Sequence, residues 1–481
     1  MIQLRPTHYT HLSYILIFIV IALFLSACSS STTGEYTDVQ PENTDNIAHE
    51  PGEMSREIPF VYTTKRQLTI TFNGMGDADM MYRILDQLGE LGIKATFFLP
   101  GMRVAEEPNI AKEIVARGHD VQNNTLNRND LTKLSYDEIY QEINLANEVI
   151  QEKTGVTPKY IRTKSGEYND DVRLAATEAG LDAVIYYSAN PQDWDMKSAE
   201  AIADYVSKYI TRGGIITLNA DINPAVVDAL PLIYDQVKDT GYELVTLSQL
   251  VEEGSERKPL EEIEGYDAAQ INPNYDAAEP EVIELLDQNK KQIALTFDDW
   301  GRDKRITRIL DILAEQNVKA TFFLRADGVE ANPNLAAAIE AEGHDIANHT
   351  YSHPVLTGMA QDKIQQEIVK AHQVLTYALQ KQPLMIFRPP TGEIDEPSAQ
   401  AIAATGYKKI VLYDVTTLDW DVNHHADHII NGSLEQTKNG SIILLHLQDE
   451  LYTADALPTI ITKLKSKGYE FVLLSDVLGL N

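Results

Sequence analysis

The segment IALTFDDWGR, residues 293–302, decides the fold of half of this chain, because an apolar run there ends in two carboxylates. Nearly the same segment, LTITFNGMGD, occurs at residues 68–77. Both begin as apolar runs that end in Thr-Phe, a pattern typical of a buried strand. Asp298 and Asp299 follow the second run, whereas an Asn-Gly pair follows the first. The sequence therefore carries one strand twice, and only one copy has an acidic tip.

The two segments belong to a long internal repeat. Further matches are KATFFL at 94–99 and 319–324, GHDVQNNT at 118–125 with GHDIANHT at 343–350, and GYELVTLSQL at 241–250 with GYEFVLLSDV at 468–477. The offset drifts only from 225 (94 to 319) to 227 (241 to 468), which indicates duplication of a whole domain. We predict domains at 61–252 and 288–481, called the first and the second copy, with an acidic linker at 253–287 that could hold a short helix near its end.

Each copy alternates strand-like and helix-like segments. In the second copy the expected strands are 293–297, 320–324, 345–348, 385–387, 409–413, 441–445 and 470–474, and the expected helices include 305–316, 334–342, 363–380 and 396–405. This alternation is typical of a parallel α/β sheet or barrel. Seven strands predict two tandem (β/α)7-type, TIM-like barrels with a missing or irregular strand. Active residues then belong at the C-terminal strand ends, where Asp298 and Asp299 fall.

The composition limits the partners. The chain has 481 residues, 43% of them apolar, which is long enough for two or three globular domains. A net charge of −32 argues against nucleic acid, because phosphate binding needs clustered lysine and arginine. The sequence carries no signal for an oligomeric state.

The N-terminus predicts export and attachment to a membrane. Residues 12–27, LSYILIFIVIALFLSA, precede Cys28, the one cysteine of the chain. The pattern is that of a bacterial lipoprotein signal at 1–28, cut before Cys28 and lipidated on its thiol; the alternative is an uncleaved membrane anchor. Residues 29–60 are rich in Ser, Thr, Pro and acids, so we expect a flexible tether. Either alternative places the remaining chain outside the cytoplasm.

The second copy also contains residues whose side chains could bind a metal ion or transfer a proton. His349 and His353 are spaced i, i+4, which would place both imidazoles on one side of a helical turn. Two histidines and one carboxylate form a facial metal site with open positions, suited to Zn²⁺ and other divalent metals. The remaining carboxylate could act as base and His446 as acid, which is apparatus for hydrolysing an amide or ester. Each motif alone is common in structural roles, but their joint order at strand ends favours an active site.

These motifs resemble the polysaccharide deacetylase family, with its NodB-type domain, also called carbohydrate esterase family four. TFDD, HTYSH, RPP, DW and LLH occur in the family's order along the whole second copy. The resemblance implies a distorted (β/α) barrel. It also implies a metal-dependent hydrolase that removes acetyl groups from N-acetylglucosamine or N-acetylmuramic acid units of peptidoglycan, chitin or related polymers.

The resemblance also implies a role for each matching residue. The general base is Asp298, oriented by Arg388, and the metal ligands are Asp299, His349 and His353. Asp419 keeps His446 protonated, and His446 protonates the leaving amine. Trp420 and Leu444 line the acetyl pocket, and the backbone N–H of Thr391, after Pro390, contacts the oxyanion. Zn²⁺ is the preferred metal, with Co²⁺, Mn²⁺, Ni²⁺ or Fe²⁺ as alternatives.

The second copy departs from the family pattern at three positions. Trp300 stands where the family usually has glycine, Thr391 replaces an aromatic residue, and Leu447 replaces the Asp that commonly follows the histidine. The first two changes lie near the expected sugar subsites, so they affect the expected substrate more than the chemistry.

The first copy serves as an internal control. Aligned by the offset, Asp298, Asp299, His349, His353 and His446 become Asn73, Gly74, Asn124, Arg128 and Ala220. We therefore expect a catalytically inactive domain that holds glycan, packs against the active copy or spaces it from the membrane, with packing or spacing favoured. His344 and Asp345 recur in the first copy as His119 and Asp120, so we expect them to be structural.

The sequence is compatible with three functions. The first is an N-deacetylase of cell-wall glycan, because peptidoglycan is the nearest acetylated polymer to a tethered bacterial enzyme. The second is an O-acetyl esterase of the kind that acts on xylan, since the same site can cleave esters. The third is a non-catalytic wall-binding lipoprotein, which the intact residue set of the second copy opposes.

Overall fold

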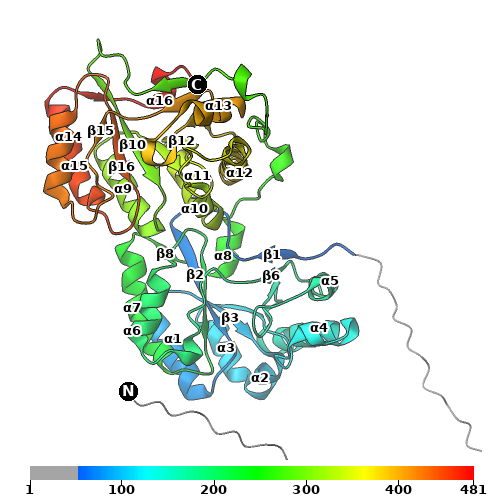
Figure 1. The fold of residues 1–481 in the computed structure, drawn as a ribbon. Helices are drawn as coiled ribbons and strands as arrows, with labels where there is room; N and C mark the ends of the chain where they lie inside the picture. Colours follow the sequence, from blue (N-terminus) through cyan, green and yellow to red (C-terminus); the bar gives the residue numbers. More distant parts are fainter. Residues whose placement is uncertain (1–51, 481) are drawn as a thin grey trace, which may run out of the picture. The chain divides into compact units, whose positions relative to one another are not determined.

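The computed structural model of the chain describes residues 52–480. The described residues form one compact unit, which contains two sheets of parallel strands (Figure 1). The predicted signal segment with Cys28, and the tether up to residue 51, lie outside the described residues. Within the described part, the chain has no helix that combines the length and the apolar character needed to span a bilayer.

The first copy forms an eight-stranded sheet. Its strands are β1 (Arg56–Ile58), β2 (Gln67–Asn73), β3 (Thr96–Leu99), β4 (Asp120–Asn123), β5 (Tyr160–Ile161), β6 (Ala183–Ile185), β7 (Ile215–Asn219) and β8 (Glu243–Leu244). The strand order is β1-β6-β5-β4-β3-β2-β7, and β8 pairs with β2. Its helices are α1 (Ala78–Leu91), α2 (Gly101–Glu106), α3 (Pro108–Ala116), α4 (Tyr136–Thr154), α5 (Asp170–Glu178), α6 (Ala199–Ser207), α7 (Ala225–Asp239) and α8 (Leu247–Glu252).

The second copy forms a nine-stranded sheet in the order β15-β16-β10-β11-β12-β13-β14-β9, with β17 paired to β10. Its strands are β9 (Glu281–Ile283), β10 (Gln292–Asp299), β11 (Thr321–Leu324), β12 (Asp345–Asn348), β13 (Leu384–Phe387), β14 (Lys409–Val411), β15 (Val415–Thr416), β16 (Ile442–His446) and β17 (Glu470–Phe471). Its helices are α9 (Asp303–Glu315), α10 (Ala326–Ala331), α11 (Pro333–Ala341), α12 (Gln361–Leu379), α13 (Glu396–Ala404), α14 (Ala426–Gln436), α15 (Thr453–Ser466) and α16 (Leu474–Val477).

Short 3₁₀ turns complete both copies and the segment between them. They are Leu131–Lys133, Asp193–Asp195, Leu260–Glu262, Tyr275–Ala277 and Pro390–Gly392.

The sequence explains the core of each sheet. In β2 and β10 nearly every residue is buried, because helices cover the outside of a parallel sheet and side chains fill its inside. Phe72 stacks on Phe97 in the first copy as Phe297 stacks on Phe322 in the second, with ring centroids 4.8 and 5.0 Å apart. In Figure 1, α14 and α15 flank β15 and β16. The prediction of two tandem barrel-like α/β copies is confirmed.

Two short strands lie outside the predicted domain limits. Residues 56–58, assigned to the tether, form β1, which pairs with β6. Residues 281–283, in the predicted linker, form β9 beside β14, where a short helix was the expectation. Both are three-residue edge strands, Arg-Glu-Ile and Glu-Val-Ile, and such short segments carry little periodic signal. The strands predicted within the second copy all occur, β12 with the predicted ends and the others with shifted ends, and β15, α10, α14, α15 and α16 are additional.

Candidate active site

The predicted site residues of the second copy converge at the C-terminal edge of its sheet. Asp298 and Asp299 end β10, and His446 ends the neighbouring β16, directly opposite Asp298 in the strand register. His349 follows β12, and Arg388 follows β13. Because all of these strands are parallel, their C-terminal ends share one edge, which is where barrel active sites are built.

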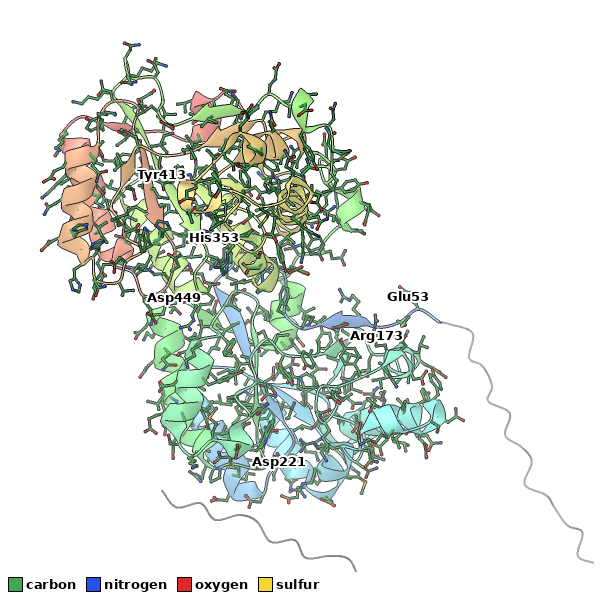
Figure 2. The ribbon with its side chains drawn as sticks, in the orientation of Figure 1. Glu53, Arg173, Asp221, His353, Tyr413 and Asp449 are labelled. Atoms are coloured by element: carbon green, nitrogen blue, oxygen red, sulfur yellow. The ribbon has the colours of Figure 1, made fainter. Side chains whose placement is uncertain are left out.

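Three side chains form a candidate metal centre. The ligand atoms of Asp299, His349 and His353 all lie within 4.8 Å of one another. Nε2 of His353 is 3.3 Å from Oδ1 of Asp299, and Nε2 of His349 is 3.9 Å from the same oxygen. Figure 2 labels His353. The two histidines lie in a loop rather than in the predicted helical turn, and His353 has a φ of 63°. A bend in the loop, rather than helical periodicity, brings the rings together.

The chemistry of His349 fits a cation. Its Nδ1 is 2.8 Å from the carbonyl oxygen of Arg388, which can only accept, so Nδ1 carries the proton. Burial lowers the pKa of His349 to about 3, so its ring is neutral and Nε2 has a free lone pair. That lone pair lies 3.7 Å from Oδ2 of Asp298 and near Asp299, an arrangement that favours a divalent cation between them.

Asp299 has a strained backbone. Its φ is 77°, a left-handed value that costs any residue with a Cβ. The aligned residue of the first copy is Gly74, with a φ of 79°. The position therefore suits glycine, and a carboxylate there indicates that function outweighs local strain.

Asp298 forms a buried pair with Arg388. Nη1 of Arg388 donates to Oδ1 of Asp298 at 2.7 Å and to Oγ1 of Thr296 at 2.8 Å, while Nε and Nη2 donate to the carbonyls of Val411 and Leu412. Burial raises the pKa of Asp298, and the Arg388 charge opposes this. The arginine therefore favours the ionised carboxylate that a general base requires.

Asp419 and His446 form a second pair. Nδ1 of His446 is 2.7 Å from Oδ1 of Asp419, and the backbone N–H of His446 donates to Oδ2 at 2.9 Å. Thr453 also donates its hydroxyl to Oδ2. Burial alone would lower the pKa of His446, but the Asp419 carboxylate reverses this and the pKa is raised. A protonated imidazole opposite Asp298 is suited to act as an acid.

The residues predicted to contact substrate take different positions. Leu444 is buried in β16, beside Thr296 of β10. Trp420 is 54% exposed, directly after Asp419, and is thus available to a ligand from solvent. Thr391 lies in the turn after β13 with a φ of 64°.

Gln448 is a site residue that sequence reasoning missed. Its side-chain amide donates to Oδ2 of Asp299, on the carboxylate edge away from His353. Gln448 lies two residues after His446, so the alternation of an extended strand would have placed both side chains on one face. Such a contact orients a ligand carboxylate.

The first copy keeps the frame of this site without its reactive groups. Nη1 of Arg162 donates to Thr71 and, at 3.3 Å, to Oδ1 of Asn73, which is an amide. Asp193 accepts from the backbone and side chain of Asn219, at 2.9 and 2.6 Å. These contacts match the bonds of Arg388 to Thr296 and Asp298 and those of Asp419 to His446; in addition, Arg162 donates to Thr217 at 3.3 Å.

Those contacts correct one position of the sequence alignment. Asn219 pairs with Asn73 in the strand register as His446 pairs with Asp298, so Asn219, not Ala220, is the counterpart of His446. The second copy has one additional residue between Asp419 and His446, and a single fixed offset misses it. The correction leaves the conclusion intact, because an amide cannot replace an imidazole as acid.

An ion pair occupies the position of the metal centre in the first copy. Arg128, the counterpart of His353, bonds through Nη1 to Asp221, which corresponds to Gln448. Figure 2 labels Asp221. A Cβ on Gly74 would lie 2.4 Å from Oδ2 of Asp221 and 2.6 Å from Nη1 of Arg128. The guanidinium of Arg128 thus lies where the second copy has its candidate metal ligands.

The histidines expected to be structural take part in strand contacts at the opposite edge. Nδ1 of His344 accepts from the backbone of Ala320 at 3.1 Å, and Nδ1 of His119 accepts from Ala95 at 3.2 Å. Burial lowers the pKa of both to about 4. Asp345 accepts from Thr321 in the same region.

The sequence is similar to those of known proteins. The family model described as polysaccharide deacetylase matches residues 61–184 and 286–410. A peptidoglycan-N-acetylglucosamine deacetylase of Bacillus cereus is 42% identical over 193 residues, covering 39% of this chain and 69% of that protein. A deacetylase of the same description from Listeria monocytogenes is 26% identical over 413 residues, 83% of this chain and 84% of that protein.

A solved structure of a peptidoglycan N-acetylglucosamine deacetylase matches with a TM-score of 0.40 and 36% identity, covering 42% of this chain and 94% of that one. The family model matches both copies and more than half of the chain. This chain therefore belongs to the polysaccharide deacetylase family.

Proposed function

We propose that the second copy is a metal-dependent hydrolase that removes N-acetyl groups from the amino sugars of peptidoglycan. The observation that carries the proposal is that three side chains suited to hold a metal ion lie at the strand edge that also carries the pairs Asp298–Arg388 and Asp419–His446. Asp298 is favoured as a carboxylate by Arg388, and His446 as an imidazolium by Asp419. A base, an acid and a cation site within one strand edge suit amide hydrolysis.

Each residue has a part in the proposed reaction. A divalent cation held by Asp299, His349 and His353 would acidify water and polarise the acetyl carbonyl. Asp298 accepts the proton of the attacking water. His446 donates a proton to the sugar nitrogen as the C–N bond breaks, and acetate and the free amine leave. The backbone N–H of Thr391 donates to the developing oxyanion.

The substrate assignment rests on the relatives and on the pocket residues. Both relatives described above are named for deacetylation of N-acetylglucosamine in peptidoglycan. Leu444 and the exposed Trp420 suit contact with an acetyl methyl group and a sugar ring. Zn²⁺ is the proposed metal, since two imidazoles and one carboxylate are typical of its catalytic sites.

Location and domain limits complete the proposal. We infer a lipoprotein attached through Cys28, with the enzyme acting on the outer side of the membrane. The proposed limits are 61–252 for an inactive copy and 288–481 for the active one, with β1 and β9 added as edge strands. The internal Arg128–Asp221 pair supports the inactivity of the first copy, because its positive charge repels a divalent cation.

Release of acetate tests the proposal. The full chain is loaded with Zn²⁺ and given peptidoglycan, N-acetylchitooligosaccharides and acetylated xylan, and Asp299→Ala is the matched inactive variant. We expect acetate from peptidoglycan, lost in the variant. Acetate from xylan alone would favour the O-acetyl esterase. A protein that binds Zn²⁺ and retains glycan, yet releases no acetate from any substrate, would be a wall-binding module instead.

A further inference from the structure

Helix α9 follows the candidate metal ligand Asp299 after three residues, and its first turn lacks a cap of its own. The N-cap residue, Arg302, makes no side-chain capping bond. In the first copy the matching residue, Asp77, caps α1 by accepting from the backbone of Met80 at 2.9 Å. The second copy instead has a carboxylate one residue later, at Asp303, whose side chain is 1% exposed.

Asp303 receives most of its hydrogen bonds from the first copy. Within the first copy the donors are Arg212 Nη1 at 2.6 Å, Thr211 Oγ1 at 3.0 Å, the Arg212 backbone at 3.4 Å and the Tyr242 hydroxyl. Within the second copy they are Thr307 Oγ1 at 2.9 Å and Asn332 Nδ2 at 3.4 Å. A buried carboxylate needs such a shell, since an unpaired one costs much free energy. The first copy therefore completes a group that begins a helix of the second.

A second buried contact also joins the second copy to the first copy. The side-chain amide of Asn334, at the start of α11, donates to the carbonyls of Val61 and Arg212, both at 2.8 Å. Its oxygen accepts from the backbone of Thr63 at 3.1 Å. Asn334 is 1% exposed, so water does not compete for these bonds. Two helices that start at the catalytic edge are thus held by loops of the first copy.

We propose that the first copy positions the metal-binding loop of the second, with Arg212 as the positioning residue that acts through Asp303. The loop from Asp299 to Asp303 is short, so the placement of the first turn of α9 restricts where the Asp299 carboxylate can lie. Gly301 lies against the backbone at Leu447, because an added Cβ would be 2.2 Å from that carbonyl oxygen. A shift of the helix start would therefore be transmitted along the loop and not absorbed by it.

This role goes beyond that of a spacer and accounts for retention of an inactive copy. It rests on the proposed function only in naming the 299–303 loop as catalytic. The test therefore includes two readouts that need no substrate: the hydrogen-exchange rate of the loop and the Zn²⁺ affinity of the full chain.

The test compares Arg212→Met with a control at the same interface. Arg66 pairs with Asp311, which lies eight residues further along α9, and their side chains are 29% and 36% exposed. We expect Arg212→Met to speed amide exchange in residues 299–306 at least about tenfold, and to weaken Zn²⁺ binding by about tenfold, as loss of an outer-shell partner does. Arg66→Met should leave both within about twofold of wild type.

Two further variants keep the result interpretable. Arg212→Lys keeps the positive charge and should recover part of the Zn²⁺ affinity, which a general loss of stability would not predict. If Arg212→Met fails to fold, the double variant Arg212→Met/Asp303→Leu leaves no unpaired charge and should fold with weakened Zn²⁺ binding.

Wild-type loop exchange and Zn²⁺ affinity in a folded Arg212→Met or double variant would overturn the proposal. Absence of acetate release by the wild type would count against the proposed function alone, since both readouts stand without substrate.

Discussion

Replacement of Arg388 by methionine, compared with the same change at Arg162, isolates the energy of the Asp298 charge. Both arginines are fully buried, and each donates to two backbone carbonyls and to a threonine hydroxyl. They differ in two partners: Arg388 faces the Asp298 carboxylate, whereas Arg162 faces the Asn73 amide and also donates to the Thr217 hydroxyl at 3.3 Å. Costs from the unpaired carbonyls are common to both variants. Arg162→Met also loses the weak bond to Thr217, so the excess cost of Arg388→Met is a lower bound on the effect of the carboxylate.

The expected difference depends on pH. Leaving a buried charge unpaired costs about 3–5 kcal/mol. Protonating a carboxyl with an ordinary pKa of about 3.9 costs about 5.6 kcal/mol at pH 8 but only about 1.5 kcal/mol at pH 5. Arg388→Met should therefore lose about 3–5 kcal/mol more unfolding free energy than Arg162→Met at pH 8, and at most about 1.5 kcal/mol more at pH 5, where Asp298 takes up a proton instead.

The direction of this pH dependence follows from the linkage between proton binding and folding. Burial already raises the pKa of Asp298, and loss of the arginine raises it further. A carboxyl whose folded-state pKa is raised contributes stability below its unfolded pKa and loses it as pH rises through the folded value. The same shift moves the acidic limb of the activity profile to higher pH, because the base must be ionised.

Denaturant unfolding of the metal-free full chain at pH 8 and pH 5 measures the difference in unfolding free energy between the two variants. Acetate release measured across pH locates the acidic limb of the activity profile. Equal losses for the two variants at pH 8 and pH 5 would refute the reasoning, because they would mean that Asp298 bears no charge or that water screens it. Arg162→Met is expected to leave the pH profile of acetate release unchanged.

Three further outcomes are expected. Asp419→Asn removes the charge that raises the pKa of His446, so the alkaline limb of acetate release should move to lower pH; an unmoved limb would assign that limb to another group. Asp299→Gly should abolish Zn²⁺ binding, measured by competition with a chromophoric chelator, yet leave the metal-free protein as stable as wild type, because glycine suits the φ of 77°; a large loss of stability would contradict the strain argument. Gln448→Ala should weaken Zn²⁺ binding by about tenfold in the same assay, and unchanged affinity would show that Asp299 needs no such support.

Some features of this structure could be predicted from the sequence and others could not, and the difference has physical reasons. β10 could be predicted because the short run 293–297 is mostly apolar and ends at charged residues, a pattern consistent with a buried strand. The pairs Asp298–Arg388 and Asp419–His446 could be anticipated because the resemblance to a known family implies them. The contact between Asp303 and Arg212 was not, since polar contacts between residues distant in sequence leave no periodic trace.

The two copies also separate what the fold requires from what the reaction requires. Arg162 and Asp193 persist in the first copy with the contacts of Arg388 and Asp419, although no base or acid remains for them to serve. Each satisfies backbone groups inside the barrel: Arg162 binds the carbonyls of Ile185 and Tyr186, and Asp193 accepts from the backbone of Asn219. Buried polar groups without such partners would destabilise the sheet in either copy. Arg388 and Asp419 are therefore structural residues first, and the active copy uses their fixed charges to set the protonation of Asp298 and His446.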